Sequence, residues 1–141
     1  MEAVLDIPEG FERHDRRSPV TDPWEPLYRR LSGDTVVLAL RAAARHCNSR
    51  GFVHGGLISA LADNAMGLSC ARKLGDLASL VTVNLTVDFL GSALTGQWLE
   101  FDTVFVKPGG TLCFTQAFVT ADCQPCARAN AVFRVVRKAA A

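Results

Sequence analysis

One segment of the chain, residues 55–74, constrains the fold more than any other. It is apolar and rich in small residues, and its larger apolar side chains recur with the 3.6-residue period of an α-helix. The members of this stripe are Ile58, Leu61, Ala65 and Leu68. Gly75 follows directly and is a residue that commonly ends a helix. The sequence therefore predicts a single long helix, which must bury its apolar stripe against strands.

After this helix the hydrophobic period changes to two, which is typical of β-strands. Residues 80–90 alternate, and this predicts one apolar face with Val81, Val83, Leu85, Val87 and Phe89, and one polar face with Thr82, Asn84, Thr86 and Asp88. Further strands are expected at residues 35–44, 97–107, 111–121 and 127–137, with turns at 108–110 and 122–126. Short connections imply antiparallel hairpins. We therefore predict an α+β fold in which an antiparallel sheet of five or six strands wraps around one long central helix.

The composition excludes several classes of protein. The chain has 141 residues, which fits one domain, and its 49% hydrophobic content is too high for a disordered chain. A net charge of +1 lacks the basic excess of nucleic-acid-binding proteins, and no apolar run approaches the roughly 20 residues of a membrane span. The start of the chain, Met1–Asp6, is acidic rather than signal-like. We expect a cytoplasmic protein that has neither nucleic acid nor a membrane as its partner.

Residues 1–33 form an N-terminal arm that differs from the remainder, residues 34–141, which we expect to be the folded domain. Four of the six prolines fall in the arm, so its regular structure should be short. One short helix is expected after Asp22, with Trp24 and Tyr28 on it, and charged residues cluster at positions 12–17. The arm is expected either to pack its aromatic side chains on the core or to form a flap over a site.

The five cysteines are expected to be reduced thiols, because their number is odd and no secretion signal precedes them. Cys123 and Cys126 match a C-x-x-C spacing. A metal site would need two further ligands, and a thioredoxin-like site would need a βαβ context. Strands are predicted on both sides of the pair, so we interpret it as the tip of a hairpin and predict no metal site.

The first turn of the predicted helix offers bare backbone amides. Gly55 and Gly56 open the helix, their N–H groups have no intrahelical acceptor, and the helix dipole adds partial positive charge there. An amide in such a place can approach a ligand carbonyl closely and polarise it. The alternative is that the glycine pair only permits a tight turn from strand to helix.

Asp63 is the only carboxylate between residues 51 and 74. On a helical wheel it points away from the apolar stripe, towards a face that holds Ser59, Met66, Gly67 and Cys70. A carboxylate among such neighbours is suited to act as a base or nucleophile, and a solvated surface aspartate is the alternative. At about 1.5 Å per residue, Asp63 lies about 12 Å from Gly55 along the axis. One substrate could reach both groups only if two antiparallel copies of the helix met, which predicts a homodimer with shared sites.

These residues resemble the hotdog-fold acyl-CoA thioesterases, in particular the phenylacetate-degradation type. The pattern Asn-x-x-Gly-x-x-His-Gly-Gly occurs at residues 48–56, and Leu-x-Asp follows on the helix at 61–63. The resemblance implies that the Gly55 amide polarises the thioester carbonyl and that Asp63 of the facing subunit activates water or attacks as a nucleophile. It implies that Asn48 and His54 hold the carbonyl, the water or the leaving sulfur.

The resemblance also implies further substrate contacts. Thr82 matches a hydroxyl-bearing position in the strand after the helix, although a β-branched strand residue would explain it equally. Gly56 belongs to the helix start that approaches the substrate, and the CoA arm would follow loops that contain Ser92, Lys107 and Gly109. Trp24 and Tyr28 of the arm are candidate residues of a lid over the acyl pocket.

The resemblance favours hydrolysis of an acyl-CoA thioester to a carboxylate and CoA, without a separate cofactor, by a homodimer that often pairs into a tetramer. No Gly-x-Ser-x-Gly motif is present, which disfavours a serine-nucleophile hydrolase. The alternatives are a non-catalytic acyl-CoA-binding hotdog protein and a hotdog dehydratase or hydratase. Nothing in the sequence distinguishes aryl from short, medium or long acyl chains.

Overall fold

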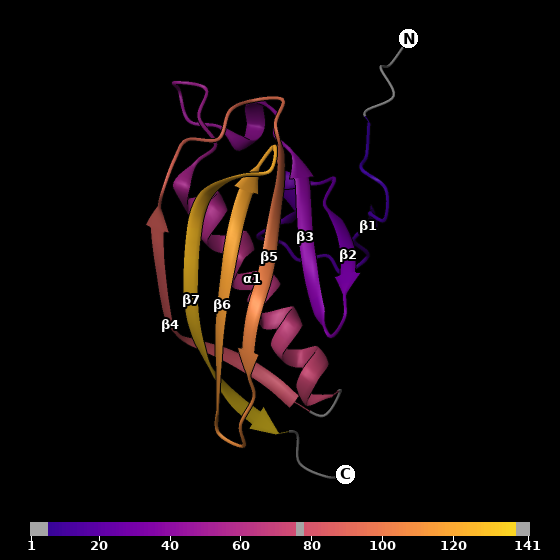
Figure 1. Ribbon diagram of the computed structural model, residues 1–141, viewed down its shortest axis with the longest axis vertical. Helices are drawn as coiled ribbons and strands as arrows, with labels where there is room; N and C mark the ends of the chain where they lie inside the picture. The colour runs from indigo at the N-terminus through magenta and orange to yellow at the C-terminus, as the bar shows by residue number, and fades with distance from the viewer. Residues whose placement is uncertain (1–5, 76–77, 138–141) are drawn as a thin grey trace.

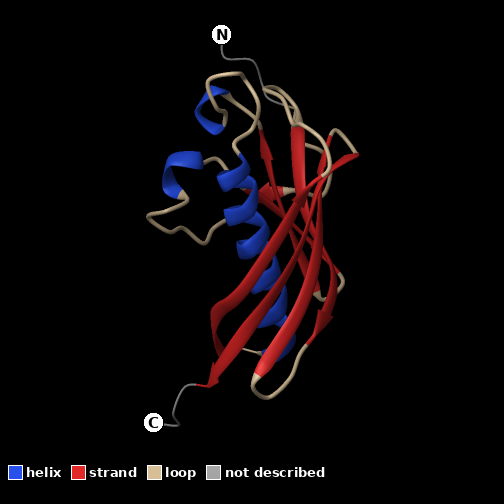
Figure 2. Ribbon diagram, turned by 90° about the vertical axis from the view of Figure 1, so that its left-hand side faces the viewer, coloured by secondary structure: helices blue, strands red, loops and turns tan. Residues whose placement is uncertain are grey.

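The computed structural model describes residues 6–75 and 78–137. In this part of the chain a single long helix, α1, spans Gly55–Leu74 and lies along the concave side of a curved sheet (Figure 2). The helix has the predicted bounds, and Gly75 ends it with a positive φ of 85°. Within the described residues, no helix is both long enough and apolar enough to cross a membrane.

The sheet is antiparallel throughout, and its described strands follow the order β1-β2-β3-β5-β6-β7-β4 (Figure 1). The strands are β1 (Glu12–Arg13), β2 (Tyr28–Ser32), β3 (Thr35–Arg41), β4 (Ala78–Phe89), β5 (Trp98–Lys107), β6 (Leu112–Ala121) and β7 (Gln124–Arg137). The predicted α+β fold, with a sheet wrapped around one long helix, is confirmed. The described sheet has seven strands rather than five or six, because the arm contributes β1 and β2 at one edge.

The hairpin between β6 and β7 is tighter than expected. Asp122 and Cys123 both have positive φ values, 45° and 68°, so two residues suffice for the turn and β7 already begins at Gln124. Cys123 is exposed at the turn, whereas Cys126 is buried in the strand. Among the described residues, no three potential metal-ligating side chains lie grouped together.

The helix buries a wider face than its predicted stripe. Ile58, Leu61 and Ala65 are buried as expected, but Met66 and Cys70 are also fully buried. The side of the helix on which Met66 and Cys70 were predicted to lie with Asp63 is therefore covered by the sheet at these two residues. The physical reason is the curvature of the sheet, because α1 packs against β3, β4, β5 and β6 and so meets strands on more than one side.

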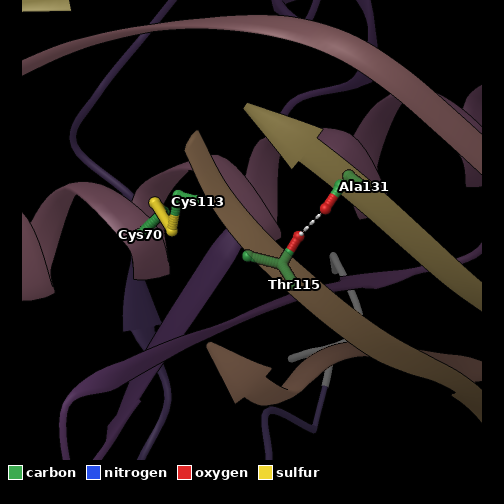
Figure 3. The surroundings of a disulfide bond; sticks show 4 residues. All are labelled: Cys70, Cys113, Thr115 and Ala131. Carbon is green, nitrogen blue, oxygen red and sulfur yellow. Dashed lines mark hydrogen bonds between the residues drawn. A yellow bond between two sulfur atoms is a disulfide. The ribbon is translucent and has the colours of Figure 1, made fainter. Parts of the chain in front are cut away.

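Cys70 and Cys113 form a disulfide that joins α1 to β6 (Figure 3). Both residues are fully buried, and beside them the Thr115 hydroxyl donates a 2.9 Å hydrogen bond to the carbonyl of Ala131 on β7. The expectation of five reduced thiols is wrong for this pair. The two cysteines are 43 residues apart, and only the docking of the helix on β6 brings them together.

Reduction of the disulfide is expected to lower the thermal stability of the protein. By the loop-entropy relation, a cross-link that closes a loop of 43 residues stabilises the fold by about 4 kcal/mol. Alkylation in denaturant, followed by mass spectrometry, should label Cys47, Cys123 and Cys126 without reductant and all five cysteines after reduction. Tm should fall on reduction, also in a Cys123→Ser control. Five labelled cysteines without reductant would contradict this assignment.

The arm packs onto the sheet. Leu27 is buried in the core, while the rings of Phe11 and Tyr28 lie 5.3 Å and 5.5 Å from the Trp98 ring. Trp98 is next to the core residue Leu99 in β5, so these rings lie on the sheet face that turns away from α1. The expected short helix is a single 3₁₀ turn, Asp22–Trp24, because Pro26 lacks the N–H needed to continue it.

Candidate active site

The start of α1 is capped by His54. Its Nδ1 accepts a 2.8 Å hydrogen bond from the backbone N–H of Gly56. A neutral imidazole that accepts at Nδ1 carries its proton on Nε2, so His54 keeps one ring donor for another partner. The side chain is exposed, and that donor is therefore accessible.

Both glycines of the first helical turn have close neighbours. A Cβ atom on Gly55 would lie 3.1 Å from Cζ of Phe89, and one on Gly56 would lie 3.0 Å from Nδ1 of His54. The aromatic ring at the end of β4 thus packs directly on the backbone of Gly55. The Gly55 N–H lies beside the Gly56 amide that His54 caps, in the first turn, where amides have no intrahelical acceptor.

Asn48 organises the loop that leads into the helix. Its Oδ1 accepts hydrogen bonds from the backbone N–H groups of Arg50, at 2.9 Å, and Phe52, at 3.2 Å. Gly51 completes this turn with a φ of 82°. The side-chain oxygen of Asn48 is therefore engaged by its own loop, and a direct contact with substrate stays a prediction.

Asp63 and Thr82 form the central pair of the site. The Thr82 hydroxyl on β4 donates a 2.8 Å hydrogen bond to Oδ1 of Asp63 on α1. Asp63 is half-buried, and the second carboxylate oxygen is left for another partner. A hydrogen bond to the ionised form holds the carboxylate in one orientation.

A β-bulge places Thr82 on the helix side of the sheet. The pairing of β4 with β7 shifts between Thr82 and Asn84, so Val83 is an extra residue in the strand. Thr82 therefore shares the helix side with Val87, which packs on the core, and not with Asp88, which pairs with Arg128 on β7. The predicted alternation through residues 80–90 is wrong at this point, because period-two reasoning assumes an unbroken ladder.

A cavity of about 420 Å³ opens beside this pair. Three parts of the chain meet at its wall: α1 with Asp63, the strands with Thr82, and the arm. The remaining lining residues are Asn64, Gly67, Leu68 and Ala71 from the helix, Leu38, Ser79, Leu80 and Phe133 from the sheet, and His14, Arg16, Arg17, Ser18, Thr21 and Leu27 from the arm.

The arm reaches the cavity through residues that the sequence analysis did not select. Trp24 and Tyr28, the expected lid residues, do not line it. Tyr28 lies against Trp98 on the other face of the sheet, and Trp24 packs on the core, where its carbonyl oxygen pairs with Nε2 of His46 at 3.0 Å. The charge cluster at positions 12–17 was the available signal, but its place in the fold depends on how the arm crosses the sheet.

The loops expected to hold the CoA arm lie at opposite ends of the sheet. Ser92 follows β4 at the end where α1 begins, whereas Lys107 ends β5 and Gly109 lies in the β5–β6 loop, at the end where α1 stops (Figure 1). A Cβ atom on Gly109 would lie 2.7 Å from the carbonyl oxygen of Leu112, so this tight loop requires glycine there. One chain by itself does not bring the two loops together.

Comparison with known proteins gives a family match. The family model described as "Thioesterase superfamily" matches residues 50–125. A Pseudomonas aeruginosa protein that carries a provisional esterase name is 37% identical over 133 residues, which is 94% of this chain and 99% of that one. Human acyl-coenzyme A thioesterase 13 is 30% identical over 87 residues, 60% of each chain.

Solved structures share the fold. A variant of the phenylacetic acid degradation protein PaaI from Thermus thermophilus superposes with a TM-score of 0.73 at 21% identity, covering 83% of this chain and 98% of that one. A Streptococcus mutans protein bound to acetyl CoA gives a TM-score of 0.72 at 24% identity, with 90% and 98% covered. A thioesterase from Streptococcus pneumoniae, described as hypothetical and solved with coenzyme A, gives 0.70 at 19% identity, with 81% and 88% covered.

Proposed function

Because the chain belongs to the thioesterase superfamily, we propose that it hydrolyses acyl-CoA thioesters, in active sites shared by two copies of the chain. The observation that carries the proposal is the hydrogen bond from Thr82 to Asp63 at the wall of a cavity. A volume of about 420 Å³ lies within the range of small-molecule sites. The names of the relatives support CoA as the leaving group, because one is an acyl-coenzyme A thioesterase and two fold neighbours were solved with CoA or acetyl CoA.

In the proposed reaction the Gly55 amide donates a hydrogen bond to the thioester carbonyl and stabilises the negative charge that develops on its oxygen. Asp63 of the facing subunit removes a proton from water, and the water oxygen attacks the carbonyl carbon. Collapse of the tetrahedral intermediate breaks the C–S bond. The CoA sulfur leaves and takes up a proton, so the products are a carboxylic acid and CoA.

Asp63 acts as a base in this scheme. The alternative mechanism to test is one in which Asp63 acts as a nucleophile. As a nucleophile it would form a mixed anhydride with the acyl group, which water then cleaves. A single turnover in ¹⁸O-labelled water tests the nucleophilic route in which water attacks the Asp63 carbonyl carbon of the anhydride, because only that route leaves ¹⁸O in the peptide that contains Asp63. Label found only in the released acid excludes that route.

His54 is proposed to donate a hydrogen bond to the leaving sulfur, and Asn48 is proposed to hold the loop before α1. With Nδ1 engaged by Gly56, the exposed Nε2–H of His54 is free to donate towards the departing sulfur. Asn48 holds the loop before α1 through Arg50 and Phe52 and leaves its side-chain NH₂ for the substrate. Gly56 is proposed to contribute to substrate binding through its place in the first turn of α1.

The proposed homodimer follows from the exposed strand β4. This strand is one of the two edges of the described sheet, and its residues Val81, Val83 and Phe89 are 53%, 54% and 54% exposed. A long apolar edge strand invites pairing with another chain, and in a two-fold dimer the second copy of β4 meets it antiparallel. The end of one subunit then lies beside the opposite end of its partner. This supports a shared site in which Ser92 of one subunit and Lys107 and Gly109 of the other hold the CoA arm.

A tetramer is proposed on the outer face of the sheet. Phe105 on β5 and Phe114 on β6 are 50% and 46% exposed there. Apolar side chains of neighbouring strands form a surface on which two dimers can pair. Light scattering after size-exclusion chromatography measures the assembly, and a Phe105→Lys, Phe114→Lys variant should stop at the dimer.

Removal of the Thr82 hydroxyl is expected to weaken catalysis without unfolding the protein. A hydrogen bond to a charged group is worth about 1.5–3 kcal/mol, so Thr82→Ala should lower kcat/KM by about 10- to 100-fold. Thr82→Ser keeps the hydroxyl and should retain most of the activity. Equal losses in the two variants would show that the methyl group, not the bond to Asp63, matters.

The proposed function is tested by CoA release from a panel of acyl-CoAs that differ in chain length and aryl character. Appearance of free thiol with at least one member supports a thioesterase. Tight binding without thiol release would favour a non-catalytic acyl-CoA-binding protein. Hydration of an enoyl-CoA without thiol release would favour a hydratase.

A further inference from the structure

The cavity beside Asp63 has walls of unlike chemistry. Towards the sheet it is lined by the apolar side chains of Leu38, Leu80 and Phe133 beside two hydroxyl residues of β4, whereas the arm supplies three basic side chains, His14, Arg16 and Arg17, and two further hydroxyl residues. A pocket for a purely hydrocarbon acyl chain would be apolar along its whole length. The polar groups of the arm therefore point to a substrate with a polar group of its own.

His14 is a buried polar side chain without a partner. It lines the cavity, is only 8% exposed, and its Nδ1 has no hydrogen-bond partner among the described residues. Burial lowers its pKa, and the nearby guanidinium of Arg29 acts in the same direction, while Asp15 and Glu25 oppose it and Arg16 adds a smaller lowering. The ring is neutral at pH 7 and can both donate and accept one hydrogen bond. Buried polar groups are normally satisfied, so this ring keeps unused hydrogen-bonding capacity at the wall of the cavity.

The arginines of the arm leave an excess of positive charge at the cavity. Arg17 pairs with Asp22 at 3.2 Å and lies 4.0 Å from Glu25. Arg16 has no ion pair within residues 6–75 and 78–137, whereas Arg29 pairs with both Asp15 and Glu12. Among the lining residues Asp63 is the single carboxylate, whereas Arg16 and Arg17 contribute two guanidinium groups.

We propose that the arm recognises a carboxylate at the far end of the acyl group, so that the preferred substrates are CoA thioesters of dicarboxylic acids. This inference rests on the proposed thioesterase function. With the thioester carbon held at Asp63, the acyl chain passes Leu80 and Phe133, and its free carboxylate meets Arg16 and His14. A guanidinium and a neutral imidazole together supply donors for both carboxylate oxygens.

The test compares substrates that differ only at the far end of the acyl chain. Adipyl-CoA, hexanoyl-CoA and 6-hydroxyhexanoyl-CoA have the same chain length and the same CoA, so contacts with the CoA phosphates cancel. We expect kcat/KM for adipyl-CoA to exceed that for hexanoyl-CoA by about tenfold or more, since a site built for a polar group rejects the analogue that lacks it. The hydroxy compound should fall near hexanoyl-CoA.

Two variants assign the preference to the arm. Arg16→Gln should remove most of the discrimination by lowering kcat/KM for adipyl-CoA alone. Arg13→Gln is the matched control, because Arg13 belongs to the same arm and pairs with Glu25 at 3.3 Å but does not line the cavity. It should keep the preference. An unchanged preference in Arg16→Gln would overturn the inference.

The outcomes separate this inference from the proposed function. Hydrolysis of all three thioesters at similar rates, or a hydroxy compound as good as adipyl-CoA, overturns carboxylate recognition and leaves the thioesterase intact. If no thioester releases CoA, the proposed function fails, and calorimetry decides the inference. Tenfold tighter binding of adipyl-CoA than of hexanoyl-CoA, lost in Arg16→Gln, supports it, and equal binding overturns it.

Discussion

Replacement of Asp63 with asparagine is expected to abolish most thioester hydrolysis while the fold and the assembly survive. The change removes the negative charge that accepts a proton from water but keeps an oxygen that can still accept the Thr82 hydrogen bond. Loss of a general base typically lowers turnover by about 10²- to 10⁴-fold. The effect should appear in kcat, with KM little changed, in an assay of CoA release.

Asp88→Asn is the matched control for this variant. Asp88 lies on the same strand as Thr82, but on the other side of the sheet, where it is 51% exposed and pairs with Arg128 at 3.0 Å. The same loss of charge there should leave activity within about twofold, as expected for a surface ion pair. Near-normal turnover in Asp63→Asn, with Tm and assembly unchanged, would refute the role assigned to Asp63.

Mixing two inactive variants is expected to restore activity if the active sites are shared between subunits. Gly55→Pro removes the helix-start amide, and proline suits the first position of a helix. His54, with φ −64° and ψ 132°, already has the extended backbone that precedes a proline. In a random 1:1 mixture with Asp63→Asn, half of the dimers are mixed and each has one of two sites intact, so about a quarter of wild-type activity should return.

Gly55→Ala is the control for crowding. It adds the same Cβ, which would lie 3.1 Å from the exposed ring of Phe89, but keeps the N–H. It should retain far more activity than Gly55→Pro. The mixture is assayed after the subunits have exchanged, by CoA release against each variant alone. Absence of recovery, with mixed dimers demonstrated by differently tagged chains, would mean that both groups act within one chain.

Local pattern predicted most of the elements but not the edge of the sheet that the arm forms. The 3.6-residue period and Gly75 predicted the bounds of α1, and alternation located the strands from β3 onwards. The strands β1 and β2 were not predicted, because Glu12–Arg13 is too short to show a period and Tyr28–Ser32 forms a strand by pairing with β3. Such pairing is a long-range property that no local window contains.

The candidate site likewise contains residues that the sequence predicted and residues that only the folded structure brings to it. Asp63 and Gly55 were selectable from the residues of one stretch of chain, whereas Thr82 was selected from the family resemblance. The structure joins the Thr82 hydroxyl to Oδ1 of Asp63 at 2.8 Å. The side of the sheet that Thr82 faces depends on the bulge at Val83, which alternation cannot reveal. His14 joins the same cavity from a distant segment, so only the folded chain shows its place.

The buried disulfide makes the movement of the helix measurable. Both sulfur atoms lie between α1 and β6 without exposure to solvent, so a reductant reaches them only when the two elements separate. At high reductant concentration the rate of reduction becomes independent of that concentration and equals the rate of opening. The limiting rate of disulfide reduction therefore measures how often α1, the helix that carries Asp63, separates from the sheet in the native protein.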